Sequence, residues 1–258
     1  MLKGSGVLEA WPTVVLTNHR RPINVPRVTA DATASAGPEG SAATDTNSTG
    51  DDITLNAYRY DGRFTVSIEL LMASEINLEE LLTDLASRAI ANQVAAQLAL
   101  GDGTTEPAGV FTSGVVTTGV TAAAETSITV DEAMECCTTA LPKGYRKQAK
   151  VVSDELFTSL LTARDDNGQF MLRTLDGGGS TFCGKPMFQE PAADQTSIST
   201  GEIHLVAGDF ERGLLFRSTP MLFKRTDGDD PPNPVFHFAA WVDSAIADTA
   251  ALRCVVTA

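Results

Sequence analysis

The longest regular pattern of hydrophobic positions lies between residues 77 and 100. Its apolar side chains recur at helical spacings, at Leu78, Leu81, Leu82, Leu85, Ala89 and Leu98. Asn77 followed by Glu80 matches a capping box, and Gly101 marks the end of the pattern. The sequence therefore predicts a helix over residues 78–100, which is about 34 Å long at 1.5 Å per residue.

A second pattern surrounds a polar run. Between Thr29 and Asp52 the chain has no large hydrophobic residue and consists mainly of Ala, Ser, Thr, Gly, Asp and Glu. The flanking runs, 23–28 and 53–66, alternate as strands do, and the apolar positions of the second run change parity after Ala57. Two strands around a polar tip predict an extended hairpin. Such a hairpin has no core of its own, so either another chain covers it or it is mobile.

The rest of the chain reads as a mixture of short elements. Residues 1–23 predict an arm leading into a strand, with Trp11 and the run 14–16 as apolar anchors. Beyond residue 101, helical and strand-like segments alternate. We expect helices at 130–140 and 154–164, strands at 185–188, 203–207, 214–216 and 235–242, a turn at 165–168 and a loop at 227–232.

Composition and charge narrow the class of protein. The 258 residues are 43% hydrophobic and 20% charged, which is typical of a folded chain with a substantial core. No run approaches 18 apolar residues, so no membrane span is expected. The net charge is −14, with 19 Lys and Arg against 33 Asp and Glu. Because nucleic-acid binding depends on cations that neutralise phosphates, this balance argues against that function.

Several short motifs resemble catalytic or ligand-binding sites, but each lacks a residue or a structural context that such a site requires. The run 179–185 has the spacing of a phosphate-binding loop, but Pro186 stands where that motif needs Ser or Thr. Gly101-Asp102-Gly103 follows a helix rather than a strand, so it predicts a helix stop and a turn. The histidines have no metal-ligand spacing, and the four cysteines are expected to be buried and reduced. We therefore predict no active site, no cofactor and no metal.

The order of the features nevertheless matches a known pattern. The matching segments are Pro22-Ile23-Asn24-Val25-Pro26, then Val66-Ser67-Ile68-Glu69-Leu70-Leu71, then the run 101–111 (GDGTTEPAGVF), and later Tyr145-Arg146, 165–170 (DDNGQF), 184–187 (GKPM), 207–210 (AGDF) and 243–251. In this order they resemble the major capsid proteins of tailed bacteriophages, which have the Hong Kong 97-type fold. The resemblance runs from about Val14 to the C-terminus, and the 101–111 stretch is its most specific part.

The resemblance implies an α+β fold with a defined division. The parts would be an N-terminal arm (1–22), an E-loop (23–65), a P-domain (66–125, completed by about 218–242) with a spine helix at 77–100, an A-domain (126–217) and a C-terminal segment of the A-domain (243–258). It also implies a structural protein and not an enzyme. Copies would assemble in the host cytoplasm as pentamers and hexamers into an icosahedral head around double-stranded DNA. Portal, scaffold and cement proteins would be its further partners.

Two departures from the family matter. Residues 24–62 contain no lysine, so we expect no isopeptide bond from this loop. The arm begins almost at Met1, so a scaffolding segment is expected to be removed already or supplied by a separate protein. Contacts between subunits then carry the stability, and their candidates are Trp11, Arg27, Arg59 and Arg63.

Two alternatives remain open at this stage. An encapsulin-like compartment shell has the same fold but encloses protein cargo instead of DNA. A soluble hydrolase with a serine triad assembled from distant residues would act as a monomer or small oligomer.

Overall fold

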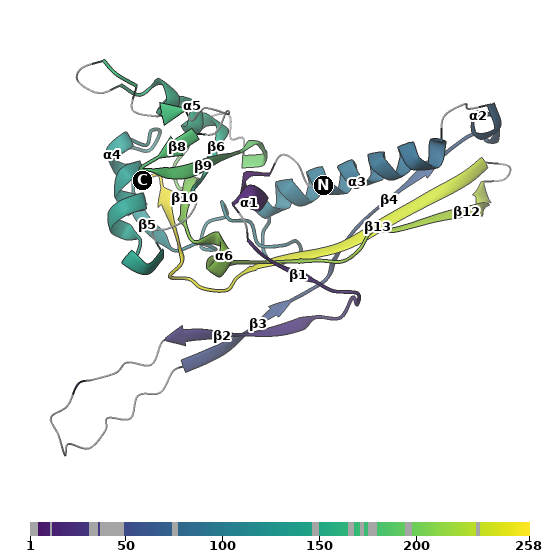
Figure 1. The fold of residues 1–258 in the computed structure, drawn as a ribbon, viewed down its shortest axis with the longest axis horizontal. Coiled ribbons are helices and arrows are strands. Elements are labelled where there is room, and N and C mark those ends of the chain that lie inside the picture. The colour runs from purple at the N-terminus through teal and green to yellow at the C-terminus, as the bar shows by residue number, and fades with distance from the viewer. Residues whose placement is uncertain are drawn as a thin grey trace.

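The computed structural model describes residues 5–10, 12–30, 36, 49–73, 77–145, 150–164, 168–170, 173–174, 180–193, 198–230 and 233–258. Two sheets form the body, and a two-stranded ribbon extends away from it (Figure 1). The fold is α+β. Trp11 and most of the polar run 29–52 lie outside the described residues, as does most of the expected turn at 165–168.

A five-stranded sheet carries the long helix. Its central strand is β13 (Asn233–Ile246), which pairs with β4 (Tyr58–Thr65) on one side and with β11 (Leu214–Ser218) and β12 (Leu222–Asp230) on the other. At the edge, β1 (Thr13–Leu16) runs parallel to β11. Part of the expected 227–232 loop therefore belongs to β12.

Helix α3 (Leu78–Leu100) has the predicted length and lies along this sheet (Figure 1). The N-cap is also as predicted, because the Asn77 side chain accepts a hydrogen bond from the Glu80 N–H, which is one of the two bonds of a capping box. The predicted buried face is wrong in part: Leu81 and Leu85 are 45% and 43% exposed. The buried residues on the face toward the sheet lie four or eight positions apart, because α-helical side chains at i and i+4 share a face; they are Leu82, Ala86, Val94 and Leu98.

A seven-stranded sheet forms the other half of the body. Its order is β5 (Thr118–Thr121), β14 (Leu252–Val256), β10 (Ile203–Gly208), β6 (Lys150–Ser153), β9 (Lys185–Glu190), β8 (Ser180–Phe182) and β7 (Arg173–Thr174). Strand β10 is buried along its whole length, and a separate hydrophobic cluster packs on each face of the sheet. The larger part of the hydrophobic core therefore packs against the seven-stranded sheet.

Short helices complete the two halves. They are α1 (Gly6–Glu9), α2 (Ile68–Ala73), α4 (Val130–Glu135) continued by a π-helix (Cys136–Ala140), a 3-10 turn (Lys143–Tyr145), α5 (Asp154–Thr162), a second 3-10 turn (Pro191–Ala193) and α6 (Phe210–Gly213). The helix expected at 130–140 is thus present but changes its hydrogen-bonding pattern halfway. No described helix is long and apolar enough to cross a membrane.

A buried carboxylate holds the first helix in place. Glu190 accepts hydrogen bonds from the Ser5 hydroxyl (2.8 Å) and the Val7 N–H (3.0 Å). Burial raises the pKa of Glu190, although these bonds oppose the shift. Val7 is fully buried in the core of the seven-stranded sheet. Part of the expected N-terminal arm is therefore packed on the body.

The run 101–111 closes the C-terminus of α3. Three carbonyl oxygens at the end of the helix accept hydrogen bonds from the next segment, in the pairs Gly109 N–Gly101 O, Val110 N–Leu98 O and Phe111 N–Ala99 O, each at 2.9 Å. The Asp102 carboxylate accepts three backbone N–H bonds, from residues 104, 105 and 106, and these lower its pKa to about 2. This is the helix stop and turn that the glycines predict.

The false phosphate loop is a β-hairpin. Strands β8 and β9 pair antiparallel, and Cys183 and Gly184 form the turn with φ values of 51° and 71°. Positive φ at both central residues is typical of a type I′ turn. Cys183 is exposed, contrary to expectation, because the turn carries it away from the body; the other three cysteines are buried.

Candidate functional site

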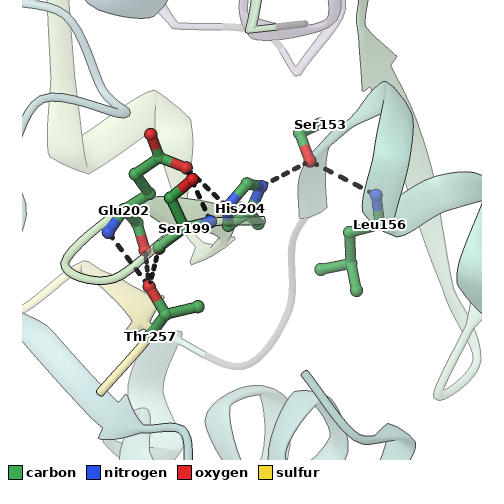
Figure 2. A network of polar contacts seen from close by, with 6 residues as sticks. All are labelled: Ser153, Leu156, Ser199, Glu202, His204 and Thr257. Atoms are coloured by element: carbon green, nitrogen blue, oxygen red, sulfur yellow. Dashed lines mark hydrogen bonds and ion pairs between the residues drawn. The ribbon is translucent and has the colours of Figure 1, made fainter. Parts of the chain in front are cut away.

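A serine, a histidine and a glutamate do come together in the seven-stranded sheet, as Figure 2 shows. Ser153 Oγ lies 3.0 Å from His204 Nδ1, and His204 Nε2 lies 3.5 Å from Glu202 Oε2. Ser153 and His204 are both fully buried. No substrate reaches a nucleophile in that position, so the arrangement does not support the hydrolase alternative.

The same contacts serve the fold instead. Ser153 Oγ caps α5 by accepting the Leu156 N–H at 3.4 Å. Glu202 accepts the Ser199 N–H at 3.0 Å and donates its own N–H to Thr257 Oγ1 at 3.1 Å (Figure 2). The network therefore joins β6, β10 and the C-terminal segment. Among the described residues, no three metal-ligating side chains gather in one place.

Acidification is expected to destabilise the subunit through His204. Burial lowers the pKa of His204 below its ordinary 6.5, against the opposing effect of Glu202. The unfolded chain then takes up the proton at higher pH than the folded chain, so this contribution is complete above pH 6.5 and is lost as pH falls below it. Urea unfolding from about pH 8 to pH 5 measures the slope. His204→Gln should flatten it; an identical slope in the variant would exclude His204 as the cause.

The ribbon is the most distinctive surface of the molecule. Strand β2 (Ile23–Ala30) pairs antiparallel with β3 (Thr49–Leu55), and the two leave the body together (Figure 1). Ile23, Val25 and Ile53 share one face and are half-buried, with Arg27 and Asp51 further along the same face; Asn24, Pro26, Asp52 and Thr54 on the opposite face are exposed. The predicted hairpin is therefore present, and one of its faces is apolar near the body. We call Ile23, Val25 and Ile53 the apolar ribbon face.

The returning run is two strands rather than one. After Leu55 the chain leaves the ribbon, and β4 enters the five-stranded sheet beside β13. The switch falls where the apolar positions change parity. Residues 58–65 of the expected hairpin thus belong to the body sheet.

A buried arginine lies where the ribbon meets the body. Arg217, on β11, is fully buried and donates to carbonyl oxygens at 2.8–3.0 Å. These oxygens belong to Leu55, the last residue of β3, to Asn56 after it, and to His19 and Arg21 before β2. We call this set, with Asp243, the root junction.

Asp243 supplies the opposite charge in the root junction. It occupies the position on β13 that pairs with Arg217, and its carboxylate accepts the Asn56 N–H and the Ser244 N–H. Burial raises the pKa of Asp243 and lowers that of Arg217, and each charge opposes the shift of the other. A buried charge without such partners costs several kcal/mol, roughly 3–5 when one partner is removed.

The face of the five-stranded sheet opposite α3 carries a row of basic residues. Arg63 on β4, His237 on β13 and Lys224 on β12 occupy paired positions, so they share a face. Further along the same strands, Arg59 lies opposite Trp241 in the register of β4 and β13. The Arg20 guanidinium lies 3.7 Å from the centre of the Trp241 ring. We call Arg20, Arg59, Arg63 and Lys224 the basic strip.

The predicted contact residues are therefore spread over two surfaces. Arg27 lies on the ribbon and pairs with Asp51 at 3.2 Å, and Arg59 pairs with Asp61 at 3.2 Å. Arg63 is exposed and has no carboxylate within ion-pair distance in the part of the chain that the structure describes. Trp11 lies outside the described residues.

Sequence reasoning missed the root junction. Arg217 follows Leu214, Leu215 and Phe216 in a buried strand, and Asp243 likewise follows a buried valine. A charged residue inside an apolar strand is costly unless it is paired, so this pattern was the available signal.

A groove of about 550 Å³ lies between β4 and α3. The Tyr60 hydroxyl donates to Gln97 across its floor, and burial raises the pKa of Tyr60. Arg59, Asp61 and Glu106 also line the groove. This is a polar surface groove with no nucleophile and base in contact.

Comparison with known proteins identifies the family of the chain. The Phage capsid family matches residues 1–257. The solved "Capsid of native GTA particle computed with C5 symmetry" has a TM-score of 0.84 at 20% identity, covering 100% of this chain and 92% of that one. Microbacterium phage Oxtober96 gives a TM-score of 0.71 at 15% identity, covering 99% and 92%. The capsid of Myoviridae phage XM1 gives 0.66 at 14% identity, also covering 99% and 92%. No curated protein matches.

The fold is that of the Hong Kong 97-like shell proteins, and the class is a structural capsid protein. The chain belongs to the phage capsid family. It is therefore a phage major capsid protein, and its place is the capsid of the virion.

Proposed function

We propose that this chain forms the icosahedral head of a tailed phage by assembling as pentamers and hexamers that enclose double-stranded DNA. The observation that carries the proposal is the apolar ribbon face. A two-stranded ribbon is marginally stable alone in water, and burial of its apolar side chains needs a partner surface. A second copy of the chain supplies that surface. Many such weak contacts, closed into a shell, add to a stable particle.

The charge of the chain supports the enclosure of DNA. A net charge of −14 has the same sign as DNA, so the wall of the shell holds the packaged genome without binding it tightly. Portal, scaffold and cement proteins are the further partners we propose. The division into arm (1–22), E-loop (23–65), P-domain (66–125 with 218–242) and A-domain (126–217 with 243–258) is part of the same proposal.

We further propose that the basic strip meets carboxylates of a neighbouring copy. The ribbon and its connecting run, residues 23–55, contain one arginine and five acidic residues, at Asp31, Glu39, Asp45, Asp51 and Asp52. Opposite charges on two copies steer association and fix register. Arg59 and Arg63 take part through the strip. Arg27 supports the ribbon through its pair with Asp51, and Trp11 is a proposed contact of the N-terminal segment.

Arg63→Glu is expected to lower the yield of shells several-fold, because exposed ion pairs contribute ~0.2–1 kcal/mol each and recur at every contact. Arg88→Glu is the matched control. Arg88 is also exposed but lies on α3, where it pairs with Asp84 at 2.7 Å. The yield is measured by sedimentation velocity at low and high salt, and the difference should shrink at high salt. Equal yields for the two variants would remove the strip from the contact; normal shells with less DNA would make it a DNA contact instead.

Negative-stain electron microscopy of the purified protein tests the assembly itself. Closed shells, or free pentamers and hexamers, are the expected result, with scaffold and protease supplied if the chain alone stays monomeric. A sample that remains monomeric with those partners would refute the proposal. Shells that hold a protein cargo instead of DNA would favour the encapsulin-like alternative.

A further inference from the structure

The root junction ties both ends of the ribbon to one side chain. A guanidinium has five N–H groups, and all five of Arg217 are used. Nε donates to Thr17 Oγ1 at 3.1 Å, and the two Nη atoms donate to the carbonyls of Leu55, Asn56, His19 and Arg21. The chain reaches β2 through residues 17–21 and leaves β3 through residues 55–56. The entering and leaving segments are therefore held by the same planar group.

Both backbone polar groups of Asn56 are hydrogen-bonded within the root junction. Its carbonyl accepts from Arg217 at 2.8 Å, and its N–H donates to the carboxylate of Asp243. Arg217 and Asp243 occupy paired positions on β11 and β13, so both are fixed by the body sheet. Because the guanidinium fork is rigid, it holds these backbone atoms at set positions relative to the sheet.

Because the ribbon is long, a small change in its angle at the root junction moves its far end by a large distance. Strand β2 has 8 residues, so at 3.3 Å per residue it is about 26 Å long, and a tilt of about 10° moves its end by about 4.5 Å. Apolar contacts need heavy atoms within about 4.5 Å of each other. A tilt of that size therefore breaks the contacts at the end of the ribbon.

We infer that Arg217, with Asp243, is the positioning residue that sets the direction in which the ribbon leaves the body and so the geometry of assembly. The inference rests on the proposed function, in which the ribbon contacts a second copy. Arg217 touches no partner itself in this account. It acts through the backbone of residues 17–21 and 55–56.

The direction of the ribbon is measurable without assembly. Spin labels at Asp52→Cys on β3 and Asn92→Cys on α3, both exposed positions, report the distance from ribbon to body. Cys183→Ser removes the exposed native thiol, and the other three cysteines are buried. In Arg217→Lys, which keeps the charge and loses the fork, the spread of distances should increase about twofold. An unchanged distribution would overturn the inference whether or not shells form.

A second measurement separates position from stability. Leu156→Ala is a matched control, because Leu156 is fully buried in a hydrophobic cluster of the seven-stranded sheet that contains no residue of the root junction. At temperatures where both variants are folded by near-ultraviolet circular dichroism, Arg217→Lys should yield at least about tenfold fewer regular shells than Leu156→Ala. If the two variants lose shell yield to the same extent for the same loss of thermal stability, Arg217 contributes stability only and the inference fails. If the wild-type chain forms no shells while its label distances are narrow, the proposed function fails and the positioning role stands.

Discussion

Replacing Gly109 by alanine is expected to lower the free energy of unfolding by about 3 kcal/mol, the upper end of the usual range for overpacking. A Cβ at this position would lie 2.5 Å from Gly101 N, 2.6 Å from Ala99 O and 2.7 Å from Leu100 N. All three are backbone atoms at the end of α3, so no side chain can move aside to relieve the clash. The three 2.9 Å hydrogen bonds that close the helix would have to lengthen together. Urea unfolding measures the loss.

Gly144→Ala is the control for this substitution. A Cβ at Gly144 would meet no atom within 4 Å. We therefore expect a change within about 0.5 kcal/mol, as for an ordinary surface position. Gly101→Ala should behave like Gly109→Ala, since its Cβ would lie 2.0 Å from Pro107 O. Similar stability in Gly109→Ala and Gly144→Ala would show that the close approach is not required.

The features that the sequence predicted well have local causes. Helix α3 was predicted with its cap because the capping side chain and its partner are three residues apart, at Asn77 and Glu80. The turn after it was predicted because glycines mark it. At Gly101 and Gly109, other backbone atoms lie so close that a Cβ would clash with them. The ribbon was predicted because strand alternation and a polar tip are visible in a short window. Even the change from β3 to β4 after Leu55 is visible locally, because the apolar positions change from odd to even residue numbers after Ala57.

The features that were missed depend on contacts between distant segments. The sequence showed a leucine-rich helix, but only the position of the sheet decides that Leu82 is buried while Leu81 and Leu85 are exposed. Arg217 meets Thr17, 200 residues away, and Leu55, 162 residues away. Arg27 likewise pairs with Asp51, which lies 24 residues away on the other strand of the ribbon. Pairing of charges across a fold is set by topology, which no short window contains.

The apolar ribbon face offers the sharpest test of assembly. Ile53→Asp is expected to leave the subunit folded and to abolish shells. Ile53 belongs to none of the hydrophobic clusters of the body, so its replacement removes no core packing there. At the contact with a second copy, however, it places an unpaired carboxylate where an isoleucine would be buried. Loss of the isoleucine alone costs about 1.5–3 kcal/mol per contact when burial is complete. Because each 1.4 kcal/mol is a factor of about ten in affinity, and every subunit makes the contact, the shell yield should fall below detection.

The opposite face of the same ribbon provides the control. Asn24→Asp adds the same charge to an exposed side chain of the paired strand. It also keeps an acceptor for the Thr54 hydroxyl, which donates to Asn24 Oδ1 at 3.0 Å. This variant should assemble with a yield within about twofold of the wild type, since an exposed surface substitution costs less than about 0.5 kcal/mol. Sedimentation velocity and electron microscopy of both variants give the answer. Loss of shells in Ile53→Asp alone means that the apolar ribbon face is the contact. Normal shells in Ile53→Asp would mean that this face stays in solvent and that assembly depends on another surface.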